Sequence, residues 1–356
     1  MSVSTRPTLL VGSVNLERAE DVLAMAADVL GDSLRSIPDG ETGERLGWYQ
    51  WQEAVLAKAP FLTRTGQGRG GDKQSVDQFE LSRYGVKGEL SGSTFDKLGY
   101  ADVAAASYGI FRQLRDEGRL SPGVRFQVSL PTPIAPLAAF IEPDDFLKVE
   151  PIYDAAMRTE IDSISEIIPA GDLAIQWDVA FEVAILEGFG WGQGIMTNPL
   201  HDMASRLEKV VSWVPSDVAV GIHMCYGDYE HKHWKEPEDT AIMVELANSL
   251  VARGSRTLDW LHLPVPRDRD DDAYFSPLQA LDISADTQLY LGLVHHTDGL
   301  EGGRRRMATA ERHVTGFGIA TECGLGRRPP DTIADVMQLM AALASEPSSR
   351  PPASVS

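Results

Sequence analysis

Short runs of apolar and β-branched residues recur along the whole chain, and each is followed by a polar stretch. Runs of this length bounded by Gly, Pro, Asp or Ser are typical of buried strands. We therefore predict eight strands, at Thr8–Gly12, Leu34–Ile37, Val124–Leu130, Leu173–Asp178, Asp217–Met224, Thr257–Leu263, Gln288–His295 and Gly316–Thr321.

Between these runs the apolar positions recur with helical spacing. The clearest predicted helices are Leu16–Leu30, Ala101–Glu117, Asp145–Ile168, Met203–Trp213, Thr240–Arg253, Gly303–His313 and Asp331–Ala344. Strands that alternate with helices indicate parallel β-α-β units. Eight such units predict an α/β fold of the (β/α)8 TIM-barrel type, and a doubly wound open sheet is the alternative.

The pattern predicts one barrel domain over residues 1–344, with long βα-loop insertions at about 48–100, 227–237 and 264–277. The Ser- and Pro-rich residues 345–356 predict a disordered tail. Inside the first insertion, Gly66, Gly68 and Gly71 have the spacing of a dinucleotide-binding loop. No convincing strand precedes them, so we interpret this segment as a flexible loop.

The chain has 356 residues and a net charge of −20, with 43% hydrophobic residues. This composition is ordinary for a globular protein, and the negative charge disfavours nucleic acid and acidic membrane surfaces as partners. The first residues lack the apolar core of a signal peptide, and no apolar run is long enough to span a bilayer. We expect a cytoplasmic protein that acts on a small molecule; the oligomeric state stays open.

Several predicted strands end in residues that can bind a metal ion. His223 and Cys225 are two residues apart at the end of one strand, so both side chains point to the same side. Cys323 follows the last strand, and His262 lies near the end of another. Because the carboxyl ends of barrel strands meet at one rim, we predict a zinc site formed by these residues.

The fourth zinc ligand is open between His262, water and a substrate atom. Two thiolates favour zinc over magnesium or calcium. The simplest alternative is that Cys225 and Cys323 are two structural, buried thiols.

Carboxylates and histidines gather at the same predicted rim. Asp39 and Glu41 follow the second strand, and Asp178 ends an otherwise apolar strand, where a buried carboxylate needs a partner. These carboxylates are candidates for acid–base work or substrate contact, and a helix cap is the alternative for Asp39. His295 is a better general-acid candidate than His296, because strand alternation turns the two to opposite sides.

Six short motifs resemble the C-terminal catalytic barrel of cobalamin-independent methionine synthase, and the similarity extends from about Thr8 to Ala344. The motifs are Val11-Gly-Ser13, Pro38-Asp-Gly-Glu41, Ile175-Gln-Trp-Asp178, His223-Met-Cys225, Leu291-Gly-Leu-Val-His295 and Cys323-Gly-Leu325. The wider group includes epoxyalkane:coenzyme M transferase and uroporphyrinogen decarboxylase.

The resemblance implies a role for each matched motif. Zinc would be held by the His-Met-Cys motif and by Cys323. Gly12 and Ser13 would hold the thiol substrate, and Asp178 would contact it. The resemblance likewise favours substrate contact for Asp39 and Glu41.

The strand that ends at His295 would supply the proton donor. A glutamate ligand of the family is replaced by His262. After Asp178 the chain reads Val-Ala-Phe-Glu182 instead of Glu-Pro, and His295 is followed by His-Thr-Asp298 instead of Ser-Pro.

Because these departures fall where substrate would bind, we do not expect methionine synthesis itself. The prediction is a zinc-dependent transferase that moves a methyl or other alkyl group to or from a thiol. A folate-type (methylated pterin) molecule is one candidate donor, and an epoxide is another. The alternatives are a zinc-dependent lyase or hydrolase, a metal-free decarboxylase-like enzyme, and a non-catalytic binding barrel. Trp191, in a Gly-rich segment, is a candidate for stacking on the substrate, unless that segment is an ordinary loop.

Overall fold

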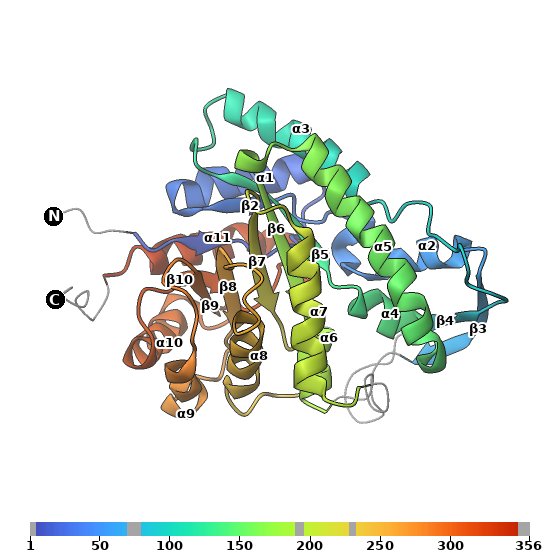
Figure 1. Cartoon of the computed structure of the whole chain (residues 1–356). Coiled ribbons are helices and arrows are strands. Elements are labelled where there is room, and N and C mark those ends of the chain that lie inside the picture. The colour runs from blue at the N-terminus through green and yellow to red at the C-terminus, as the bar shows by residue number, and fades with distance from the viewer. Residues whose placement is uncertain (1–4, 70–79, 189–195, 228–232, 348–356) are drawn as a thin grey trace.

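The computed structural model describes residues 5–69, 80–188, 196–227 and 233–347. Within these residues eight parallel strands form one sheet, in the order β1-β10-β9-β8-β7-β6-β5-β2. A parallel bridge between Thr8 and Leu34 links the two edges, so the sheet closes into a barrel (Figure 1). The strands are β1 (Thr8–Leu9), β2 (Ser36–Pro38), β5 (Arg125–Pro131), β6 (Leu173–Val179), β7 (Ala219–Met224), β8 (Trp260–Pro264), β9 (Gln288–Val294) and β10 (Gly318–Thr321). The predicted (β/α)8 TIM barrel is confirmed.

Helices connect the strands and cover the outside of the barrel (Figure 1). The longer ones are α1 (Ala19–Leu30), α3 (Tyr100–Asp116), α5 (Pro143–Ile167), α7 (Pro199–Trp213), α8 (Ala241–Val251), α10 (Gly299–His313) and α11 (Ile333–Ala344). The short ones are α2 (Glu53–Lys58), α4 (Ile134–Phe140), α6 (Phe181–Leu186) and α9 (Asp272–Phe275). In the described residues, no helix combines the length and apolar character that crossing a membrane requires.

Side chains of alternating size fill the barrel interior. Trp260 and Tyr290 are buried there among alanines, and Gly221 makes room for the indole ring of Trp260. A Cβ atom on Gly221 would lie 1.9 Å from Cε2 of that ring. Gln176 contacts this layer: it accepts a hydrogen bond from Nε1 of Trp260, and its side-chain amide donates to the carbonyl of Val11. The interior is therefore closed from below, which leaves the carboxyl ends of the strands for a site.

The structure corrects the prediction for the first insertion. Strands β3 (Leu62–Arg69) and β4 (Glu80–Val86) form an antiparallel hairpin, so Gly66 and Gly68 lie on a strand and not in a loop. The register shifts between Arg64 and Gly66, and a glycine inside a strand commonly marks such an irregularity. The backbone of Tyr84 on β4 accepts a hydrogen bond from Glu142, which ties the hairpin to the start of α5.

Candidate metal centre

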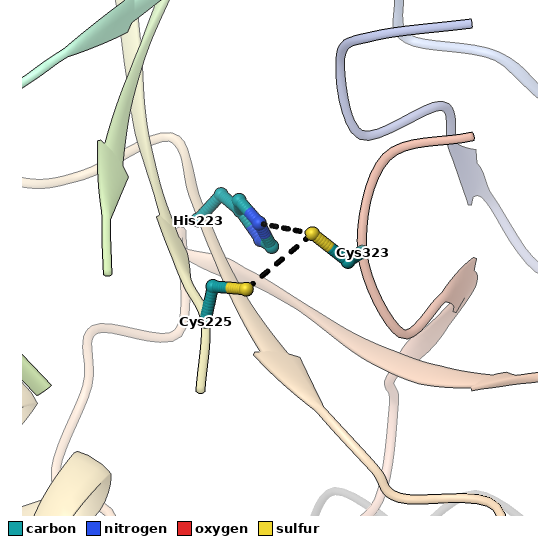
Figure 2. Close-up of side chains that lie close together, drawn as sticks. All are labelled: His223, Cys225 and Cys323. Carbon is teal, nitrogen blue, oxygen red and sulfur yellow. Dashed lines mark hydrogen bonds between the residues drawn. The ribbon is translucent and has the colours of Figure 1, made fainter. Parts of the chain in front are cut away.

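His223, Cys225 and Cys323 converge at the carboxyl end of the barrel. His223 lies in β7, Cys225 follows it, and Cys323 lies just beyond β10 (Figure 2). The two Sγ atoms are 3.3 Å apart, and the Sγ atom of Cys323 is 3.7 Å from Nε2 of His223. One ligand atom from each residue lies within 4.8 Å of the others. Side chains separated by about a hundred positions in the sequence thus face one point.

Close backbone contacts hold Cys323 over the barrel mouth. A Cβ atom on Gly292 in β9 would lie 2.6 Å from Cα of Glu322, so glycine permits this approach. Beyond Cys323, the amide of Leu325 donates to the carbonyl of Ser13 at 2.6 Å. Gly324 packs against Ser13 so closely that a Cβ atom would lie 2.5 Å from its Oγ. Cys323 is therefore held from both sides.

The three side chains fit a zinc ion. Tetrahedral zinc, with Zn–S near 2.3 Å and Zn–N near 2.0 Å, separates its ligand atoms by roughly 3.5–3.8 Å. The Sγ–Sγ distance of 3.3 Å and the Sγ–Nε2 distance of 3.7 Å lie within about half an ångström of those values, and all three ligand atoms lie within 4.8 Å of one another. Burial, and after it the neighbouring His262, lowers the pKa of His223 well below its usual range, so its imidazole is neutral. A neutral imidazole is the form that binds a metal.

A pocket opens beside the three ligands. It is lined by Gly12, Ser13, Glu41 and Asp178 from the predicted site, together with His223, Cys225 and Cys323. The structure therefore brings seven of the predicted residues to one cavity, and two of them are carboxylic acids.

Glu41 is buried and Asp178 is partly buried at this cavity, and their like negative charges repel each other. Burial, and then the charge of Asp178, raises the pKa of Glu41 well above its usual range. Burial also raises the pKa of Asp178, although the side chain of Gln176 donates to its Oδ1 at 2.9 Å. Two such acids strongly favour a positively charged group between them.

Glu41 is also strained. Its φ angle is +48°, and the φ angle of Trp48 on the same cavity is +39°. Positive φ angles are uncommon for residues other than glycine, and they cluster at functional sites. A Cβ atom on Gly12 would lie 2.8 Å from Oε1 of Glu41, so glycine at position 12 makes room for that carboxyl group.

Asp39 is not among the residues that line this cavity, and its predicted contact with substrate stays a prediction. Its carboxylate accepts two hydrogen bonds from Arg45, at 3.2 and 2.7 Å, and one from Ser107 at 2.6 Å. It also accepts from the backbone amide of Glu41 at 2.9 Å. Asp39 therefore positions the strained segment that carries Glu41.

The position of His262 departs from the prediction of a fourth ligand. Its Nδ1 lies 2.7 Å from Nδ1 of His223, and its Nε2 lies 3.0 Å from the carbonyl oxygen of Thr321. Both ring nitrogens are thus engaged, and the residue is outside the group of converging ligands. Burial lowers the pKa of His262 to about 4, so this ring is neutral too.

His295 lines a second cavity, which also contains His233 and Glu322 and shares Cys323 with the first. Its Nε2 lies 2.8 Å from the carbonyl oxygen of Val265, and its Nδ1 lies 3.6 Å from Glu322. His295 directly follows the end of β9, and its side chain is buried. His295 thus lies in a cavity next to the one that holds the metal ligands, and its predicted role as general acid stays a prediction.

Sequence reasoning missed the aromatic wall of the first cavity. Trp48 and Trp234 line it, and both contact the buried ring of Phe181, with centroids 6.0 and 5.1 Å away. Gly227 packs closely against one of them, and a Cβ atom there would lie 2.7 Å from the indole of Trp234. Arg327 lines the same cavity and was also missed. Trp191, predicted to stack on the substrate, lies outside the described residues.

The chain matches no model of a known protein family and no curated protein. Solved structures do resemble it. A B12-independent methionine synthase from Shewanella sp. W3-18-1, in complex with selenomethionine, covers 96% of this chain and 97% of its own, with a TM-score of 0.63 and 14% identity. A methyltransferase from Methanosarcina mazei covers 96% and 94%, with a TM-score of 0.55 and 13% identity. At such low identity the likeness shows a shared barrel fold.

Proposed function

We propose that this chain is a zinc-dependent transferase of the methionine synthase-like group, which moves a methyl or other alkyl group to or from a small thiol. The observation that supports the proposal most directly is the convergence of His223, Cys225 and Cys323 beside a cavity lined by the carboxyl groups of Glu41 and Asp178. A zinc ion held by these residues would supply a positive centre that lowers the pKa of an incoming thiol.

The cavity fits a thiol that also carries an amino group. Glu41 and Asp178 would bind the ammonium group, because a cation between them relieves the repulsion of the two carboxylates. Arg327 on the same cavity suits a carboxylate of the substrate. Trp48 and Trp234 would exclude water from the reacting atoms. Selenomethionine, the ligand of the Shewanella neighbour, carries an amino group and a carboxylate, with a methylated selenium where a thiol substrate would have its sulfur.

A role of His295 as proton donor stays part of the proposal only for a substrate that reaches both cavities. The two cavities share Cys323 and Gly324, so a donor molecule that passes over this segment would meet His295. The folate-type donor stays a prediction.

Metal analysis and thiol binding test the proposal together. Purified protein should contain about one zinc ion per chain, bound by thiolate and imidazole. Cys225→Ser, Cys323→Ser and His223→Gln should lose it, whereas His201→Gln, which changes an exposed histidine on α7, should keep it. X-ray absorption at the zinc edge should then show an additional sulfur neighbour when a small amino thiol is added.

Two outcomes would contradict the proposal. Folded, active protein without metal would favour a decarboxylase-like enzyme. If the protein binds zinc but no added thiol alters its X-ray absorption spectrum, a lyase or hydrolase would be favoured.

A further inference from the structure

A line of hydrogen bonds crosses the barrel mouth from β10 to β7 through His262. Its Nε2 lies 3.0 Å from the carbonyl oxygen of Thr321, and its Nδ1 lies 2.7 Å from Nδ1 of His223. All three groups are buried, and the two imidazole rings lie with their centroids 4.7 Å apart. β8, which carries His262, pairs directly with β7 but not with β10.

The direction of each hydrogen bond follows from the carbonyl group. A backbone carbonyl accepts and never donates, so Nε2 of His262 carries the proton of the first bond. Nδ1 of a neutral His262 is then an acceptor, and Nδ1 of His223 must be the donor of the second bond. With its proton on Nδ1, neutral His223 has its lone pair on Nε2, the atom that lies 3.7 Å from Sγ of Cys323.

We propose that His262 is a positioning residue of the metal centre, which fixes the tautomer and orientation of His223 so that Nε2 binds the metal. The inference rests on the proposed zinc site and changes the composition of that site: zinc has three protein ligands and one position left for substrate or water. Outer partners that hold a ligating imidazole in this way typically strengthen metal binding 10- to 100-fold.

His262 also connects the two halves of the metal centre. Thr321, whose carbonyl accepts from His262, donates from its own Oγ1 to the carbonyl of Cys323 at 2.7 Å. The His223 side and the Cys323 side are therefore linked through one ring. A fourth protein ligand at position 262 would need a free ring nitrogen, and the hydrogen bonds leave none.

Two substitutions at position 262 test its hydrogen bonds with His223 and with Thr321 one at a time. The amide of asparagine lies about where Nδ1 of histidine lies, so His262→Asn keeps an acceptor for His223 and loses the contact with Thr321. The amide of glutamine lies about where Nε2 lies, so His262→Gln keeps the contact with Thr321 and loses the acceptor. Competition with a chelator should show zinc affinity within about 3-fold of wild type for His262→Asn and 10- to 100-fold weaker for His262→Gln.

Measurements on the unchanged protein keep the inference testable if a variant fails to fold. X-ray absorption of the zinc protein should fit one imidazole and two sulfur ligands from the chain; two imidazoles would overturn the inference. ¹⁵N NMR of metal-free protein should show His223 protonated on Nδ1 and His262 on Nε2; a proton on Nε2 of His223 would overturn it. The NMR readout does not depend on metal, so it separates this inference from the proposed function.

Discussion

Glu182 is fully buried at the start of α6, and its carboxyl group has one hydrogen-bond donor. Oε1 accepts from the hydroxyl of Thr132, whereas Oε2 is buried without a partner among the described residues. Burial raises the pKa of Glu182 to about 7, although the hydrogen bond from Thr132 opposes the shift. The folded protein therefore binds a proton that the unfolded chain, with a pKa near 4.5, releases.

The burial of Glu182 predicts a loss of folding stability that depends on pH. Because the folded-state pKa is raised, stability falls as the pH rises from about 4.5 to 7, and the full cost, on the order of 3 kcal/mol, is present above pH 7. Glu182→Gln keeps an acceptor for Thr132 and removes the charge. Denaturant unfolding should show it to be more stable than wild type at pH 8, with the difference shrinking toward pH 4.5.

Glu17→Gln, which changes an exposed carboxylate, is the matched control and should show little difference at either pH. An equal effect of Glu182→Gln at both pH values would contradict the prediction.

Single residues also show which side-chain positions could be predicted from the sequence. His223 and Cys225 are two residues apart on one strand, so their common direction followed from strand geometry. The positions of His262 and His295 did not. Both lie near strand ends, and which of them meets a ligand depends on hydrogen bonds to Thr321 and Val265, far away in the sequence.

At the scale of elements, the approach between β9 and the segment after β10 decides where Cys323 lies. The register between the two strands shifts between Ile319 and Thr321, and the chain then crosses over Gly292. A Cβ atom at position 292 would lie 2.6 Å from the backbone of Glu322 and 2.8 Å from the carbonyl oxygen of Thr321. Since these neighbours are backbone atoms, they cannot rotate away.

Gly292→Ala should therefore displace Cys323. We expect a loss of about 1–3 kcal/mol in stability and a drop in zinc affinity of at least about 10-fold, measured by unfolding and by chelator competition. Gly123→Ala is the control, because a Cβ atom there would meet nothing within 4 Å. Unchanged zinc affinity in Gly292→Ala would show that the segment can shift without moving the ligand.

The barrel elements were largely predictable, and the insertion was not. The predicted strand Gln288–His295 is observed as Gln288–Val294. It could be predicted because a parallel strand that is buried on both faces is a continuous run of apolar residues in the sequence. The hairpin of β3 and β4 contains Gly66 and Gly85, residues that weaken a strand. Its contact with α5 through Tyr84 and Glu142, rather than its own composition, supports it.

At the scale of the whole molecule, the metal centre joins distant parts of the chain. Cys225 and Cys323 are 98 positions apart, and they follow strands that β8 and β9 separate in the sheet. A bound zinc ion would stabilise the folded barrel, because only the folded chain brings the ligands together.

Removal of the metal should lower the melting temperature by several degrees. Zinc at a thousand times its Kd contributes about 4 kcal/mol to the folded state. Calorimetry with and without a strong chelator measures the difference. Cys323→Ser should melt at one temperature under both conditions, and His201→Gln should behave as wild type. A wild-type melting temperature that the chelator leaves unchanged would argue against a structural contribution of the metal.

The sequence by itself determined the barrel, the order of its strands and the rim at which the reactive side chains gather. Alternating apolar and amphipathic segments suffice for this, because periodicity is a local property. Only the tertiary structure decided which side chains meet: it engaged both nitrogens of His262, turned His295 to a second cavity and added Trp48, Trp234 and Arg327 to the first. These outcomes depend on close backbone approaches and register shifts between strands, which no local pattern records.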